Sequence, residues 1–211
     1  MFNNVLLDHR HAPFNDRYLE RLENVIACAL AEYPRTFSLR VDLHFSPEWA
    51  ADDSVCCHPN TSSNVMARFT RSLIAKIEHY RRQRCQQGLR DYPNRLRYFW
   101  VRETETAMHS HYHAVLFFNK DLFRSLGAVT SGENSLWNMI QGAWLSALGL
   151  TDYPEYRSLV HFPESGSYIL ERDKPVFCQQ YEDLVFRASY LAKERTKHYS
   201  ADTRSMGASQ G

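Results

Sequence analysis

Residues 37–45 alternate without a break between apolar and polar side chains. Successive side chains of a β-strand point to opposite faces, so the apolar members share one face and the polar members share the other. The core face would carry Phe37, Leu39, Val41, Leu43 and Phe45, and the opposite face Ser38, Arg40, Asp42 and His44. The pattern therefore predicts a half-buried strand that ends at Pro47.

Helical periodicity is found on both sides of this strand. Residues 16–33 carry apolar side chains three and four positions apart, as one buried helix face does. A second helix is predicted after the N-cap candidates Ser62-Ser63-Asn64, and a third over residues 133–148 with Gly149 as its stop. A fourth, over about 179–197, turns an apolar stripe inward that consists of Tyr181, Leu184, Ala188, Leu191 and Ala192.

Three further segments have the pattern of strands. Residues 95–104 are rich in Tyr, Phe, Trp and Val, and residues 109–118 follow as their expected hairpin partner. Residues 158–170 are expected to form a short hairpin around Pro163–Gly166. The order β-α-β-β-α-β predicts an α+β fold of the ferredoxin-like or RRM-like kind, a split βαβ arrangement with an antiparallel sheet and flanking helices. Its helices would cover one sheet face and leave the polar faces of the first strand and the 109–118 strand open.

Two histidines on the predicted 109–118 strand alternate in phase. His111 and His113 share one face, whereas Tyr112 points toward the core with Ala114 and Leu116. Two imidazoles side by side on a rigid strand form half of a divalent-metal site. The alternative interpretation is a solvated strand face on which the histidines have no chemical role.

Acidic residues at the end of the preceding strand can complete such a site. Glu103 and Glu105 share one face and lie where a hairpin turns back toward the histidines. We favour Glu103 as the third ligand because it falls within the predicted strand, whereas Glu105 falls at the turn. His109 alternates in phase with the other histidines and is a further candidate. The sequence leaves the choice among these three residues open.

The polar face of the last predicted helix carries Arg187, Tyr190, Lys193 and Lys197. Tyr190 and Lys193 are three positions apart, so their side chains are neighbours on a helix. A phenol is a poor nucleophile, but a nearby ammonium group stabilises the phenolate, and a metal ion on the target phosphate lowers the remaining barrier. The pattern predicts Tyr190 as a nucleophile assisted by Lys193, although such a pair is also common on ordinary helix surfaces.

The formal net charge of +1 does not by itself indicate a nucleic-acid-binding protein. Basic residues nevertheless outnumber acidic ones strongly between residues 68 and 97. They either follow a phosphate backbone or form an ordinary solvated helix face. The residues that we assign to DNA binding are Arg40, Arg68, Arg71, Arg82, Arg187 and Lys197.

Length and composition limit the remaining possibilities. A chain of 211 residues with 44% hydrophobic and 23% charged residues is typical of one folded domain. It contains neither an apolar run long enough to span a bilayer nor the pattern of a secretory signal. Its five cysteines are an odd number without a Cys-x-x-Cys pair, which favours reduced thiols in a cytoplasm.

The segment His111-Tyr-His113 and the apolar run after it resemble the HUH motif of rolling-circle replication endonucleases, in which U is a hydrophobic residue. Tyr190-Leu-Ala-Lys193 is similar to the Tyr-x-x-Lys motif of single-tyrosine initiators in that superfamily, and residues 39–45 resemble their first motif strand. Within the superfamily, Trp100-Val-Arg-Glu103 and Tyr190-Leu-Ala-Lys193 most resemble inovirus-type replication proteins, which are also found in prophages and satellite elements as the YagK/YfjJ-like family. The likeness covers roughly residues 36–197.

This resemblance implies a mechanism and a set of partners. Mg²⁺ or Mn²⁺ would be held by His111, His113 and an acidic residue, and Tyr190 would attack a phosphodiester of single-stranded or hairpin origin DNA. The products would be a 5′-phosphotyrosine link and a free 3′-hydroxyl that primes rolling-circle synthesis, with Lys193 steadying the phosphate or the phenolate. Because the chain has no Walker A sequence, a host or partner helicase and polymerase in a bacterial cytoplasm would supply unwinding and synthesis.

The same resemblance implies a division of the chain into three segments, and it leaves alternative functions open. Residues 1–35 would be an N-terminal helical extension packed on the core, residues 36–198 the HUH endonuclease domain, and residues 199–211 a disordered tail. A transposase or relaxase of the superfamily would use the same chemistry. A non-catalytic protein on the same fold would instead bind nucleic acid by charge and aromatic stacking. Metal-dependent cleavage would separate this last class from the others.

Overall fold

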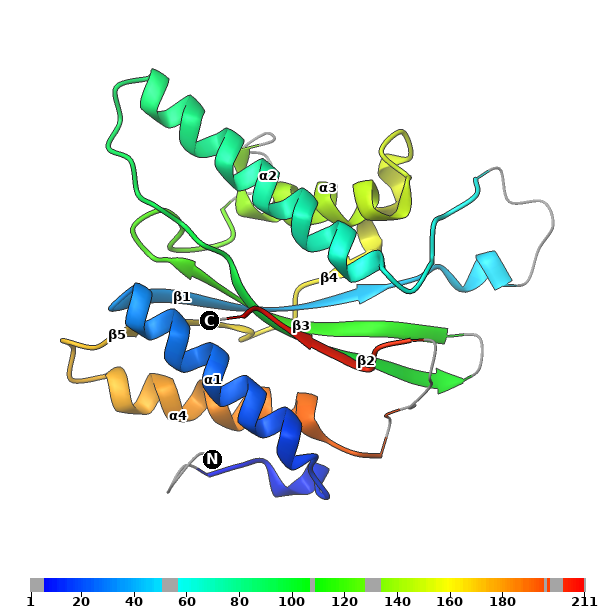
Figure 1. Ribbon diagram of the computed structural model, residues 1–211, viewed down its shortest axis with the longest axis horizontal. Helices are drawn as coiled ribbons and strands as arrows, with labels where there is room; N and C mark the ends of the chain where they lie inside the picture. Colours follow the sequence, from blue (N-terminus) through cyan, green and yellow to red (C-terminus); the bar gives the residue numbers. More distant parts are fainter. Residues whose placement is uncertain are drawn as a thin grey trace.

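The strands of the described part of the chain belong to one six-stranded antiparallel sheet (Figure 1). The computed structural model describes residues 6–50, 57–106, 109–127, 134–195, 197 and 203–210. The strands are β1 (Arg35–His44), β2 (Arg97–Thr106), β3 (His109–Asn119), β4 (Val160–His161), β5 (Ser167–Glu171) and β6 (Met206–Ala208). The α-helices are α1 (Asp16–Glu32), α2 (Val65–Gln86), α3 (Leu136–Leu148) and α4 (Phe177–Ala188). The predicted α+β class is confirmed.

The sheet has the order β4-β1-β3-β2-β6, and β5 also pairs with β1. Because β1, α2, β2, β3, α3 and β4 follow one another along the chain, the predicted β-α-β-β-α-β order is present. The hairpin of β2 and β3 places Glu103 opposite His111. On its other side β3 pairs with β1, which places Asp42 opposite His113. The histidine strand is therefore central in the sheet and has a partner on each side.

Local capping explains the bounds of two helices. The side chain of Asn15 accepts a hydrogen bond from the backbone N–H of Tyr18 at the start of α1. Ser135 caps α3 in the same way by accepting from the N–H of Asn138, so this helix begins later than its apolar pattern predicts. Gly149 ends α3 with a φ of 73°, a left-handed conformation that glycine adopts without steric cost.

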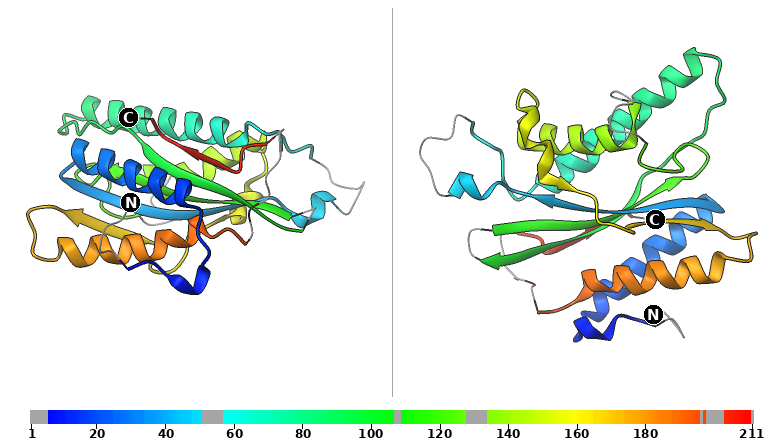
Figure 2. Two further views of the ribbon diagram at one scale, coloured as in Figure 1. Left: turned by 60° about the horizontal axis from the view of Figure 1, so that its bottom comes forward. Right: turned by 180° about the vertical axis from the view of Figure 1, so that it is seen from behind.

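Helices cover both faces of the sheet, α2 and α3 on one face and α1 and α4 on the other (Figure 1, Figure 2). None of the described helices combines the length and the apolar character that a membrane span needs. The expectation that one sheet face stays open is wrong, because β2 and β3 are apolar on both faces, as doubly covered strands are. The sheet residues of the core under α1 and α4 are Phe99, Val101, Val115, Phe117 and Leu170.

Residues 158–170 do not form the predicted hairpin. β4 pairs with the C-terminal part of β1, and β5 pairs with its N-terminal part. Both are antiparallel to β1, so they run in the same direction as two pieces of one edge strand. Residues 163–166 form a loop that interrupts this edge strand between β4 and β5. The carbonyl of Gly166 accepts a hydrogen bond from the backbone N–H of Arg40 on β1. The chain does turn where Pro163–Gly166 predict it, but the strands on either side of this turn pair with β1 instead of with each other.

The C-terminal part of the chain also differs from its prediction. Regular helix ends at Ala188, and a short 3-10 turn, Ser189–Ala192, follows it. Residues 203–210, expected to belong to a disordered tail, contribute β6, which pairs with β2. A Cβ atom at Gly207 would come within 2.5 Å of the ring of Trp100. Gly207, one of the small residues that suggested disorder, therefore permits a close approach of β6 to the sheet.

The N-terminal segment packs against the turn that follows α4. The backbone N–H of Asn15 donates to the carbonyl of Ala192, and the N–H of Glu194 donates to the carbonyl of Pro13. Phe14 and Lys193 form an antiparallel bridge. These contacts place the N-terminal 3-10 turn, His9–His11, beside the end of α4 (Figure 2).

Candidate active site

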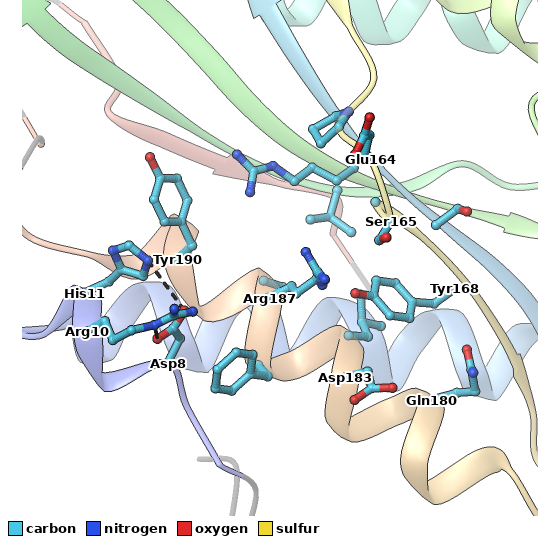
Figure 3. Close-up of a pocket in the computed structure, with 18 residues that line it drawn as sticks. Asp8, Arg10, His11, Glu164, Ser165, Tyr168, Gln180, Asp183, Arg187 and Tyr190 are labelled. Carbon is cyan, nitrogen blue, oxygen red and sulfur yellow. Dashed lines mark hydrogen bonds and ion pairs between the residues drawn. The ribbon is translucent and has the colours of Figure 1, made fainter.

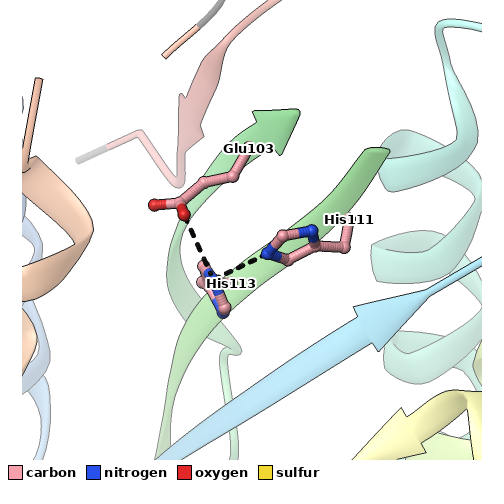
Figure 4. A group of neighbouring side chains, drawn as sticks. All are labelled: Glu103, His111 and His113. Atoms are coloured by element: carbon pink, nitrogen blue, oxygen red, sulfur yellow. Dashed lines mark hydrogen bonds and ion pairs between the residues drawn. The ribbon is translucent and has the colours of Figure 1, made fainter. Parts of the chain in front are cut away.

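Glu103, His111 and His113 lie together on the sheet face that α1 and α4 cover (Figure 4). All three side chains are buried, and their ligand atoms lie within 4.8 Å of one another. The Nε2 atoms of the two histidines are 3.1 Å apart, and Nε2 of His113 is 3.5 Å from Oε2 of Glu103. Strand alternation places the histidines side by side, and the hairpin register places the carboxylate across from them.

The donor set of this cluster fits a metal ion. Imidazole nitrogens and a carboxylate oxygen are common ligands of divalent transition metals, and three protein ligands leave positions for substrate or water. The three residues that meet are those we favour from the sequence. The side chains of the two other candidates, Glu105 and His109, lie outside the described parts of the structure.

Asp42 on β1 orients His113. Its Oδ1 atom lies 2.6 Å from Nδ1 of His113, and its carboxylate also accepts two hydrogen bonds from Arg40, at 3.1 and 3.3 Å. Burial raises the pKa of Asp42, but the hydrogen bond with His113 and the charge of Arg40 lower it more, to about 2. A carboxylate on Nδ1 turns Nε2 toward the other ligand atoms, as is usual for metal-binding histidines.

Burial opposes protonation of His113 and so lowers its pKa. Its hydrogen bonds with Asp42 and Glu103 outweigh this effect, and the pKa of His113 lies above its ordinary value. The two carboxylates therefore favour a positively charged ring when no metal ion neutralises them.

Two lysines neutralise Glu103 in its buried position. Nζ of Lys193 lies 2.9 Å from Oε2, and Nζ of Lys197 lies 2.8 Å from Oε1. Burial raises the pKa of Glu103, but the hydrogen bond with His113 and the charge of Lys197 hold it well below its usual range. The side chain of Lys197 is 0% exposed, so it does not face DNA from a solvated helix as the sequence suggests. It is a partner of Glu103 because the chain leaves its helical path before this residue.

Tyr190 joins this cluster through Lys193. The tyrosine lies in the 3-10 turn after α4, and its hydroxyl accepts a hydrogen bond from Nζ of Lys193. Its ring meets the ring of His113 edge-on, with the centroids 5.5 Å apart. One lysine thus contacts both the phenolic oxygen and the carboxylate of the candidate metal-binding group. The structure brings the predicted nucleophile, its lysine and the three favoured ligands into one continuous set of contacts.

The other residues that we assign to DNA binding lie on both sides of the sheet. Arg40 and Arg187 are on the side of the cluster, and the guanidinium carbon of Arg40 is 4.9 Å from the centroid of the Tyr190 ring. Arg68 donates to backbone carbonyls of α3 and of the loop before α2, so it stabilises the fold there. The residues on the opposite side, along α2, are Arg68, Arg71 and Arg82.

Two residues at the site carry no sequence signal strong enough to predict their roles. Asp42 belongs to the polar side of its strand, but only the pairing of β1 with β3 places it on His113. His11 comes from the N-terminal turn, and its ring meets the Tyr190 ring edge-on with centroids 4.8 Å apart. His11 also lies 3.5 Å from the carboxylate of Asp8. Asp42 is distant in sequence from His113, and His11 is distant from Tyr190, so no spacing along the chain predicts either contact.

Comparisons with known proteins identify relatives along nearly the whole chain. The YagK/YfjJ C-terminal domain family matches residues 2–209. The chain is 36% identical over 193 residues to the uncharacterized protein YagK of Escherichia coli strain K12, which covers 92% of each chain. It is 37% identical over 198 residues to the uncharacterized protein YfjJ of the same strain, which covers 92% of this chain and 94% of that protein. No solved structure matches the chain. The protein therefore belongs to the YagK/YfjJ C-terminal domain family.

Proposed function

We propose that this protein is a metal-dependent HUH endonuclease that nicks and rejoins single-stranded DNA through Tyr190, and that it initiates rolling-circle replication of a phage, satellite or plasmid. The observation that carries the proposal is the contact of Lys193 with both the Tyr190 hydroxyl and the Glu103 carboxylate. Because Lys193 contacts both groups, the candidate nucleophile and the candidate metal-binding group lie close to each other. One phosphate group could therefore meet the Tyr190 hydroxyl and a metal ion at the same time.

The proposed reaction is a transesterification. The oxygen of Tyr190 loses its proton and bonds to the phosphorus of one phosphodiester, and the bond from that phosphorus to the 3′-oxygen of the preceding nucleotide breaks. The departing oxygen takes up a proton and becomes a free 3′-hydroxyl, while the 5′-phosphate remains on Tyr190. Attack by a 3′-hydroxyl on this link reverses the step and closes the strand. Mg²⁺ or Mn²⁺ on His111, His113 and Glu103 would withdraw negative charge from the phosphate oxygens.

The residues around Tyr190 have separate tasks in this proposal. Lys193 stabilises negative charge on the oxygen to which it donates. Asp42 holds the ring of His113 so that Nε2 faces the other ligands. Arg40 neutralises Asp42 and lies over the Tyr190 ring, where its charge would also attract the phosphate.

The resemblance to HUH motifs supports the proposal, because the His111-Tyr-His113 and Tyr190-Leu-Ala-Lys193 segments meet in space. A transposase or relaxase of that superfamily would use the same residues, and the replicon sequence that the protein prefers would distinguish these roles. Unwinding and synthesis would again depend on a helicase and a polymerase of the host or of a partner.

The test uses single-stranded oligonucleotides from the protein's own replicon, labelled at either end and incubated with Mn²⁺ or Mg²⁺. The 3′ label should become covalently attached to the protein, and the 5′ label should appear on a shorter free strand. Tyr190→Phe should bind DNA and form no adduct. Tyr181→Phe is the matched control, because this half-buried tyrosine on α4 should not take part in the reaction.

Three results would reject the proposed function. They are DNA binding without any adduct, an adduct whose yield is the same in EDTA, and an adduct on a peptide that lacks Tyr190. The first of them would favour the non-catalytic nucleic-acid-binding protein instead.

A further inference from the structure

A cavity of about 660 Å³ lies beside Tyr190, lined by the N-terminal turn, the loop around residues 163–167 and α4 (Figure 3). Tyr190 and Arg40 both line this cavity, and both also belong to the candidate active site. A ligand in the cavity would therefore lie next to the proposed nucleophile. Its volume falls within the range of about 300–1,000 Å³ that is typical of small-molecule sites.

Several side chains of the cavity present polar groups that the rest of the protein does not use. Among the described residues, the guanidinium of Arg187, the hydroxyl of Tyr168 and the side-chain amide of Gln180 have no hydrogen-bond partner. In Figure 3, Arg187 points into the cavity between Tyr190 and Tyr168. Asp183, one turn before Arg187 on α4, adds a carboxylate to the same wall, although its Oδ1 atom already accepts a hydrogen bond from the side chain of Gln179. These groups offer donors, acceptors and an aromatic face to a bound molecule.

We propose that this cavity binds one unstacked nucleobase of the single-stranded DNA, next to the phosphodiester presented to Tyr190. This inference rests on the proposed function, which brings single-stranded DNA to that residue. The ring of Tyr168 is the kind of surface on which single-stranded nucleic acids stack their bases.

The polar lining favours guanine over the other bases. Arg187 can donate two hydrogen bonds to the O6 and N7 atoms of guanine, which is the commonest specific contact of arginine with a base. The Asp183 carboxylate can accept a hydrogen bond from the amino group of guanine. Adenine also carries an amino group, but it has no oxygen that could accept from the Arg187 guanidinium. The cavity would therefore select the nucleotide beside the nick.

Binding measured in EDTA separates this inference from cleavage, which requires a metal ion. The probes are fluorescent oligothymidines of about 12 nucleotides that carry one central guanine, one central adenine or one central abasic site. By fluorescence anisotropy, the wild-type protein should bind the guanine probe about tenfold more tightly than the abasic probe. The adenine probe should lie between them.

Arg187→Ala tests the assignment directly, because this exposed side chain can be removed without disturbing the core. The variant should lose the guanine preference, so that its affinities for the guanine, adenine and abasic probes become nearly equal. Arg157→Ala is the matched control, since it removes the same charge from an exposed position that we do not assign to DNA binding and that lies on the α2 and α3 side of the sheet. This variant should keep the preference.

Two results would overturn the inference: equal affinity of the wild-type protein for the guanine and abasic probes, or a guanine preference that persists in Arg187→Ala. The inference and the proposed function fail separately. A guanine preference in a protein that never forms an adduct would reject the nicking reaction and support the base site, whereas nicking without any base preference would reject the base site alone.

Discussion

The Nδ1 atom of His113 lies 2.6 Å from Oδ1 of Asp42, although the two residues are 71 positions apart in the chain. The contact exists because β1 and β3 are neighbours in the sheet and their register places these residues opposite each other. It determines which ring nitrogen of His113 faces Glu103 and His111. Metal affinity should therefore depend on Asp42 as well as on the three ligands.

We expect Asp42→Ala to weaken Mn²⁺ binding by about 10–100-fold, because the ring of His113 loses the acceptor that orients it. Calorimetric titration of the purified protein measures this change. Asp42→Asn keeps an oxygen that can accept from Nδ1 and should retain most of the affinity. Mn²⁺ affinity that is the same in wild type and Asp42→Ala would contradict the orienting role.

Glu103→Ala should reduce Mn²⁺ affinity more than Glu105→Ala, because Glu103 Oε2 is the oxygen that faces His113. The replacement also leaves Lys193 and Lys197 without their buried partner. The free energy of unfolding should therefore fall by about 3–5 kcal/mol, as measured by urea denaturation. A greater loss of Mn²⁺ affinity in Glu105→Ala would reverse the assignment of the third ligand.

Lys193→Met should tighten Mn²⁺ binding and slow adduct formation at the same time. Its ammonium lies 2.9 Å from the oxygen that a cation would share, so its removal relieves like-charge repulsion, and we expect roughly a tenfold gain in affinity. The same change removes the hydrogen bond to the Tyr190 hydroxyl. Lys197→Met is the control, because it leaves that hydrogen bond intact and should slow the adduct much less. Equal slowing in both variants would show that contact with Tyr190 is not the reason.

Gly207→Ala should destabilise the protein, because the added Cβ would meet the Trp100 ring at 2.5 Å and force β6 away from β2. We expect the free energy of unfolding to fall by about 1–3 kcal/mol. Gly142→Ala in α3 is the control, since its Cβ would meet only the flexible end of Lys76, and it should be neutral or stabilising. An unchanged free energy of unfolding in Gly207→Ala would mean that β6 contributes little to the fold.

Local patterns are sufficient to predict most of the elements and, within the candidate site, the three candidate ligands, the tyrosine and Lys193. His111 and His113 share a face in any strand, because the side-chain period of a strand is two residues. Glu103 follows from the same reasoning, since a hairpin joins strands that are adjacent in the chain and has few possible registers. Tyr190 and Lys193 come together because three residues make about one turn of either kind of helix.

The tertiary structure alone decided what surrounds those residues. The apolar stripes of α1 and α4 predict that each helix is buried on one side, but not that both would cover the histidine face of the sheet. Asp42 reaches His113 through the pairing of strands that are distant in sequence, and Lys197 reaches Glu103 because the chain turns away after α4. Contacts of this kind have no local signature, because they depend on packing summed over the whole chain and not on the spacing of neighbouring residues.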